Sequence, residues 1–157
     1  MTQTNWLQHA DSATLKVNNI INGEIEIAMG DERVNKHSPR DGHLLYHFQS
    51  SDNATVERAV AFAKAAFDDG RWSDLSVGAR RGVLLKLADL IEAHKETFAL
   101  YECLDVGKPI SNALQMDIPG AQAALRNSAE AAERVLSSTS FDGGELIYQH
   151  RSPIGVV

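Results

Sequence analysis

The sequence has few of the features that identify several classes of protein. It contains one cysteine, Cys103, so it cannot form an internal disulfide, and such a composition is typical of a reducing compartment. No apolar run approaches the roughly 18 residues needed to span a bilayer. Residues 1–16 also lack the apolar core of a signal peptide. These absences predict a cytoplasmic protein with no membrane partner.

The chain also lacks an excess of basic residues. Its formal net charge is -6, and nucleic-acid binding needs a clustered basic face, so we expect no nucleic-acid partner. Hydrophobic residues make up 43% and charged residues 23% of the 157 positions, which is ordinary for a soluble globular protein. The length fits one domain or a part of one.

Two hairpins are expected near the amino terminus. Residues 20–25 place Asn22-Gly23 between two short apolar stretches, and this dipeptide favours a tight turn because both positions tolerate positive φ. The segments 32–37 and 43–48 flank a second turn that contains Pro39 and Gly42. The first 19 residues read as a polar leader.

The hydrophobic period then becomes helical, and about four helices are expected. Ser51 or Asp52 caps the first helix, and Gly70 ends it. Ser76 opens the second helix, and the third covers residues 95–106. Asp117-Ile118-Pro119 has the cap-then-proline form of a fourth helix start.

Strands are expected again at the end of the chain. The turn Asp142-Gly143-Gly144 precedes an alternating strand over residues 146–151, and Ile154–Val157 reads as the start of another strand. Chain ends are usually exposed and frayed, so an apolar ending predicts the front part of something longer. The order of hairpins, helices and strands indicates an α/β fold.

Candidate chemical groups are few. Cys103 lies beside Glu102 and Asp105, whose negative charges disfavour a thiolate, so we predict no catalytic role for it. The sequence contains no Gly-x-Gly-x-x-Gly fingerprint. The imidazoles of His37, His43 and His47 could bind a transition metal, although polar side chains on a wet hairpin face are the simpler interpretation.

Six segments, taken in order, resemble the amino-terminal part of the aldehyde dehydrogenase superfamily. They are Ile21-Asn22-Gly23-Glu24, Ser38-Pro39 through Gly42, Ala65-Ala66-Phe67 with Gly70 and Trp72, Leu84 through His94, Leu104-Asp105-Val106-Gly107-Lys108-Pro109, and Arg151 through Val157. Asp117-Ile118-Pro119-Gly120-Ala121 resembles the amino-aldehyde branch. One departure is Asn127-Ser128, where relatives usually carry aromatics.

The resemblance implies NAD(P)-dependent oxidation of an aldehyde to a carboxylic acid. In that family the nucleophilic cysteine, the glutamate and the cofactor contacts lie beyond the equivalent of Val157. We therefore expect no catalytic and no cofactor-binding residue in this chain, and no activity when it is alone. Residues 20–140 would form the amino-terminal part of the cofactor-binding domain. Residues 141–157 would hold the oligomerisation strand of a homo-oligomer and the truncated start of the next strand.

The resemblance also implies a monovalent cation near Asp105, with backbone carbonyls from Lys36 and His37. An acid in the last turn of a helix opposes the helix dipole, so a bound cation or a hydrogen bond to the next loop could accompany Asp105. Two alternatives to the enzyme fragment stay open, namely a non-enzymatic assembly module and a metal-binding hairpin.

Overall fold

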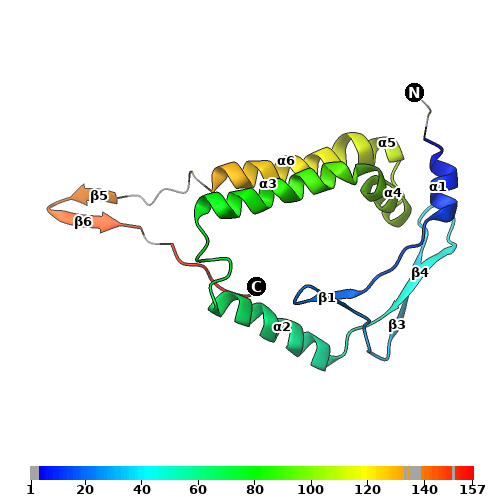
Figure 1. Cartoon of the computed structure of the whole chain (residues 1–157), viewed down its shortest axis with the longest axis horizontal. Helices are drawn as coiled ribbons and strands as arrows, with labels where there is room; N and C mark the ends of the chain where they lie inside the picture. Colours follow the sequence, from blue (N-terminus) through cyan, green and yellow to red (C-terminus); the bar gives the residue numbers. More distant parts are fainter. Residues whose placement is uncertain (1–3, 133, 135–138, 150) are drawn as a thin grey trace.

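The computed structural model describes residues 4–132, 134, 139–149 and 151–157. The elements form an open arc (Figure 1). Helices α3 and α6 lie along one arm, α2 and β1 lie along the other, and the β3–β4 hairpin closes one end. The β5–β6 hairpin extends away from the helices. The expected α/β fold, built of helices and small hairpins, is confirmed.

The described strands form three separate two-stranded antiparallel sheets. Strands β1 (Asn19–Ile21) and β2 (Glu24–Glu26) flank Asn22 and Gly23, whose φ values of 51° and 83° confirm the predicted turn. Strand β3 (Arg33–His37) pairs with β4 (Leu44–Gln49), and the register shifts between Lys36 and His37. Each sheet has two free edges, because no third strand joins it among the described residues.

Capping residues mark the starts of α2 and α3 and the end of α4, as the sequence predicts. The Asp52 carboxylate accepts from the Thr55 amide at the start of α2 (Asn53–Asp68), and the Ser76 hydroxyl accepts from Ala79 at the start of α3 (Val77–Ala93). Helix α4 (Lys95–Val106) ends at Gly107, which has a left-handed φ of 82°.

The predicted start at Asp117-Ile118-Pro119 matches the boundary at which the last long helix begins, but Asp117 does not cap it. A continuous helical run begins earlier, with α5 (Ile110–Asn112), a π-helical turn η1 (Ala113–Asp117) and α6 (Ile118–Ala131). Asp117 has helical angles and caps nothing. The run passes Pro119 because the π-turn changes the hydrogen-bond ladder just before it: the Ile118 amide donates to Ala113, five residues back.

Two elements were not predicted. Helix α1 (Trp6–Ser12) lies within the expected polar leader, where Asn5 accepts from the Gln8 amide, and seven residues are too few to show a helical period. Strand β5 (Thr139–Asp142) lies just before the turn at Gly143 and Gly144, where no strand was expected. It forms because β6 (Glu145–Tyr148) folds back on it around Gly143 and Gly144.

The end of the chain also differs from the prediction. The strand expected over 146–151 ends at Tyr148, and its position 150 lies outside the described residues. Residues 154–157 form no strand. A strand needs a hydrogen-bonded neighbour, and no described segment pairs with these residues.

Small residues form the interior of the helical arm. Ala99 of α4 and Ala113 of η1 are fully buried and cluster with Ile118, while Ala88 of α3 and Ala129 of α6 are buried elsewhere in the arm. Polar pairs link α3 and α6 along their length, between Arg126 and Asp89 and between Gln122 and Glu92. The helices can therefore approach closely, but the core that they enclose has little volume.

The protein exposes far more surface than a compact chain of its size. Its accessible surface is 11953 Å², whereas a folded monomer of this mass exposes about 7,700 Å². Large apolar side chains are exposed on α2, on β1 and on the β5–β6 hairpin, where Phe141 is 78% and Tyr148 is 71% accessible. In the described part of the chain, no helix is both long and apolar enough to cross a bilayer.

The β3–β4 turn packs against the carboxyl end of α4. A Cβ atom on Gly107 would lie 2.7 Å from Cγ of Pro39, so the backbone of α4 meets the turn at a distance that only glycine permits. In strand β4, which follows the turn, the Tyr46 hydroxyl donates to Oδ1 of Asp105 at 2.7 Å. Burial, followed by this hydrogen bond, raises the pKa of Tyr46 to about 12.

We predict that Gly107→Ala lowers the free energy of unfolding by about 1–3 kcal/mol, because alanine resists positive φ and would clash with Pro39. Gly82→Ala is the matched control. Gly82 lies within α3 with open space around its Cα, so alanine there should add about 0.5–1 kcal/mol. Urea titration followed by far-ultraviolet circular dichroism measures both, and equal effects of the two changes would contradict the packing.

We predict that Tyr46 ionises near pH 12 and that Asp105→Asn lowers its pKa, because the carboxylate disfavours tyrosinate. The folded-state pKa exceeds the ordinary value of about 10, so the contribution of Tyr46 to stability is fully present below about pH 10. This contribution is lost as the pH rises from about 10 toward 12. Tyrosinate absorbance measures the titration. Tyr46→Phe should remove the highest step and Tyr148→Phe should not; the reverse would contradict the assignment.

Candidate functional site

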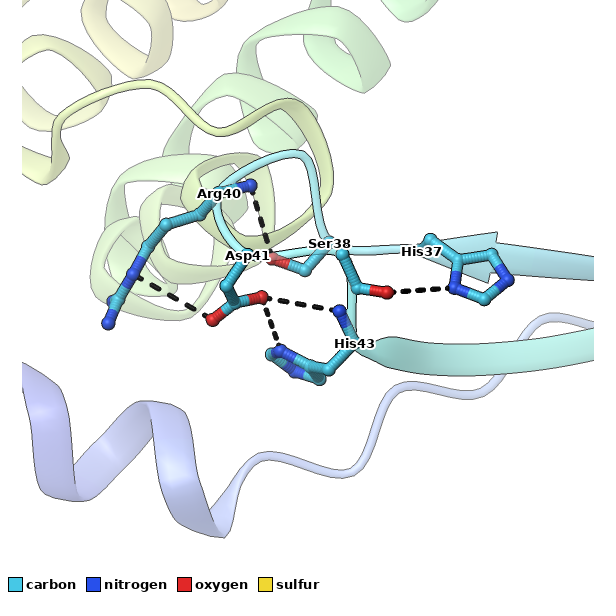
Figure 2. A network of polar contacts seen from close by, with 6 residues as sticks. His37, Ser38, Arg40, Asp41 and His43 are labelled. Carbon is cyan, nitrogen blue, oxygen red and sulfur yellow. Dashed lines mark hydrogen bonds and ion pairs between the residues drawn. The ribbon is translucent and has the colours of Figure 1, made fainter.

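The turn between β3 and β4 carries a network of polar contacts. Figure 2 shows that the Asp41 carboxylate faces both His43 and Arg40. Its Oδ1 lies 2.5 Å from Nδ1 of His43, and its Oδ2 lies 3.9 Å from Nε of Arg40. The Ser38 hydroxyl accepts from the Arg40 amide at 3.3 Å. These contacts fix the turn that packs on α4.

The network keeps Asp41 ionised. A side-chain hydrogen bond with Ser38, followed by hydrogen bonds from His43, lowers the pKa of Asp41 below its ordinary value. His43 is thereby oriented by a carboxylate through Nδ1, which is the arrangement that general bases use in enzymes. The His43 side chain is 60% exposed, so solvent reaches it.

A pocket of about 280 Å³ lies between this turn and the end of α4. It is lined by Ser38, Arg40, Asp41, His43, Cys103, Leu104, Gly107, Lys108 and Pro109. The structure thus brings Cys103, half-buried, into one pocket with the Asp41–His43 pair. The thiol makes no hydrogen bond to His43, so the pair does not activate it in the manner of a nucleophile and its base.

The three histidines considered as metal ligands are not gathered at one point. The Nδ1 atom of His37 lies 3.1 Å from the Gly42 carbonyl, while His43 contacts Asp41. His47 pairs in the ladder with Asn35, farther along the hairpin. Among the described residues, no group of three or more histidine, cysteine, aspartate or glutamate side chains could hold a metal ion.

Asp105 contacts two side chains of the hairpin. Besides the Tyr46 hydroxyl, Nζ of Lys36 lies 3.5 Å from its Oδ1. His37 is exposed on strand β3, whereas Lys36 is half-buried. The ammonium already supplies positive charge at the carboxylate, so this donor set suits a bound monovalent cation poorly. The cation site at Asp105 and His37 stays a prediction.

A second lysine connects the end of α4 with the π-turn. Nζ of Lys108 lies 2.8 Å from Oδ2 of Asp117 and 3.4 Å from Oε1 of Glu102. The hydrogen bond to Asp117 is the main reason why the pKa of Lys108 rises. The sequence offered no signal for this contact, because the cap-then-proline pattern assigned Asp117 to a helix start.

Sequence reasoning also missed Tyr46, and it gave Lys36 only a backbone carbonyl near Asp105, not an ion pair through its side chain. The contact with Tyr46 was hidden because Asp105 lies 59 residues beyond it. Taken together, the described residues offer an oriented histidine, a half-buried thiol and paired charges. They do not place a nucleophile, its base and an oxyanion donor at one point, so they build no complete active site.

Comparisons of the sequence and of the fold with known proteins lead to the same family. The profile of the aldehyde dehydrogenase family matches residues 27–157. The NADP/NAD-dependent aldehyde dehydrogenase PuuC of Escherichia coli (strain K12) is 38% identical over 153 residues, covering 97% of this chain and 31% of PuuC. The aminoacetaldehyde dehydrogenase of Pseudomonas aeruginosa is 38% identical over 138 residues, covering 87% and 28%. The chain thus spans less than a third of these relatives.

Solved structures agree with this. The indole-3-acetaldehyde dehydrogenase AldA of P. syringae, in complex with NAD+ and IAA, matches with a TM-score of 0.81 and 38% identity, covering 88% of this chain and 28% of AldA. The gamma-glutamyl-gamma-aminobutyraldehyde dehydrogenase of Burkholderia cenocepacia J2315 gives a TM-score of 0.81 and 35% identity, covering 87% and 28%. By profile, sequence and structure alike, the chain belongs to the aldehyde dehydrogenase family.

Proposed function

We propose that the chain works as the amino-terminal part of an NAD(P)-dependent enzyme that oxidises an aldehyde to a carboxylic acid. The observation that carries the proposal is the match along almost the whole chain to relatives named for this activity. The reaction consumes the aldehyde, water and NAD(P)+, and yields the acid, NAD(P)H and a proton. The nicotinamide ring, when bound, would accept the hydride from the aldehyde carbon.

The residues of this chain do not supply the reacting groups. The reaction needs a thiolate that attacks the aldehyde carbon, and the one thiol, Cys103, lies beside Glu102 in the helix α4 without a hydrogen-bonded base. The sequence also contains no Gly-x-Gly-x-x-Gly loop for a dinucleotide. The role that fits its described contacts is structural: it carries the hairpins and helices around which a cofactor domain is built.

The large exposed surface supports this role. About a third of the 11953 Å² exceeds what a compact chain of this mass exposes, and much of the excess is apolar. Apolar patches of this extent mark contact surfaces. We assign the patch on α2 and β1 to contact with further parts of the enzyme, and that on the β5–β6 hairpin to contact between subunits. The boundaries of the proposed domain part are residues 20–140, with 141–157 as the oligomerisation segment.

The substrate class that we favour is an amino-aldehyde. Two of the relatives carry names of this class, one for aminoacetaldehyde and one for gamma-glutamyl-gamma-aminobutyraldehyde. The segment Asp117-Ile118-Pro119-Gly120-Ala121 resembles the same branch.

The location that we favour is the cytoplasm, because a single cysteine in 157 residues is typical of a reducing compartment.

We predict that the purified chain does not reduce NAD+ or NADP+ with aminoacetaldehyde, and that Cys103→Ser leaves this blank rate unchanged. Absorbance of the reduced nicotinamide measures both. A hybrid in which the chain replaces the matching third of PuuC should oxidise the aldehyde. Because the hybrid keeps the thiol of PuuC, Cys103→Ser should not lower its rate.

Two outcomes would overturn the proposal. Turnover by the chain alone, abolished by Cys103→Ser, would make it an enzyme in its own right. A hybrid that is soluble, folded and bound to NAD+ but inactive with every aldehyde tested would remove the chain from the reaction.

A non-enzymatic assembly module is the second candidate, and the exposed β5–β6 hairpin favours it. Phe141, Leu146, Ile147 and Tyr148 are all exposed on two short strands with free edges. If the chain is part of an enzyme, we predict that sedimentation of the isolated chain gives no discrete oligomer. A single oligomer that unfolds cooperatively would instead favour the assembly module.

A further inference from the structure

A charged residue occupies the inner face of the β3–β4 hairpin. Along β3 the half-buried positions are Val34 and Lys36, and the residues between and beside them are exposed. Across the ladder, Val34 faces Phe48 and Lys36 faces Tyr46. Lys36 therefore follows the apolar row of the hairpin, where an ammonium is costly unless a counter-charge meets it.

Asp105 supplies that counter-charge from another element. Nζ of Lys36 and the hydroxyl of Tyr46 converge on its Oδ1, at 3.5 Å and 2.7 Å. The side chains of Lys36 and Asp105 are 34% and 42% exposed, so the pair is only partly screened by water. The cluster joins the neighbouring strands β3 and β4 to the last turn of α4, and Asp105 lies 59 residues beyond Tyr46 in the sequence.

The place of Asp105 in its helix explains why a cation is needed there. An acid in the last turn of α4 lies at the negative end of the helix dipole, and no basic residue of α4 itself lies in that turn. Positive charge at this point offsets both the carboxylate and the exposed carbonyls of the helix end. Lys36 brings it from the hairpin.

We propose that the Lys36 ammonium replaces, in this chain, the monovalent cation that the family resemblance implies at Asp105. A tethered ammonium needs no uptake from solution, and it repels a second cation that approaches the same carboxylate. The exposed side chain of His37 contacts the Gly42 carbonyl and adds no ligand at Asp105. The attachment of the hairpin to α4 is therefore independent of which monovalent cation is in the solution.

The experiment compares the chain with Lys36→Met, which is unbranched and one atom shorter than lysine and removes its charge. Thermal unfolding is measured in sodium, potassium and choline chloride at one ionic strength. The parent chain should unfold at the same temperature in all three salts. Lys36→Met should unfold about 2 °C lower in choline, and sodium or potassium should restore most of that loss.

Lys64→Met is the matched control. Lys64 pairs with Asp68 on the exposed face of α2, away from Asp105, so its removal should create no dependence on the cation. The proposal is overturned if sodium or potassium stabilises the parent chain above choline. It is also overturned if Lys36→Met responds equally to all three cations.

A second measurement does not depend on a cooperative unfolding transition. The line width of the sodium resonance should broaden with Lys36→Met, sharpen again when potassium competes, and stay narrow with the parent chain and with Lys64→Met. Broadening by the parent chain, or no broadening by Lys36→Met, would contradict the proposal.

Discussion

The structure depends on the close contact between the β3–β4 turn and the last turn of α4. At this point a left-handed Gly107 lets the helix end meet Pro39, and Asp105 holds Tyr46 and Lys36 of the hairpin. The contact joins a separate two-stranded hairpin to a helix through side chains and the close approach at Gly107. It also forms the pocket beside Cys103, so this candidate site exists because the turn and the helix end fit each other.

Local sequence signals predicted most helices and strands, but they could not predict which distant residues contact each other. Asp52, Ser76 and Gly107 fixed the ends of helices, because caps act within four residues. Asp117 does not act as a cap because it lies inside a helical run that begins at Ile110, and its carboxylate pairs with Lys108. The cluster at Asp105 needed knowledge of tertiary contacts that no spacing in the sequence reveals, and β5 became a strand only through its pairing with β6.

The helical arm shows how a chain can be well ordered and still depend on other surfaces. Buried alanines let α3, α4 and α6 approach closely, and polar pairs align α3 with α6. Alanine burial contributes little hydrophobic free energy per residue, since the gain scales with the apolar area removed. Several large apolar side chains of the arm, among them Val83, Leu87 and Phe98, are exposed instead. The stability of the arm therefore depends on what covers its outer faces.

The π-turn has a consequence for how one helical run serves two neighbours. A π-turn amounts to one residue inserted into an α-helix, and each residue rotates the helix face by about 100°. Before the turn is complete, Ala113 is buried with Ala99 of α4; after it, Ala129 is buried in the helix that packs on α3. The inserted residue thus works as a phase shift, which redirects the small-residue stripe from one partner helix to the next without a break in the chain.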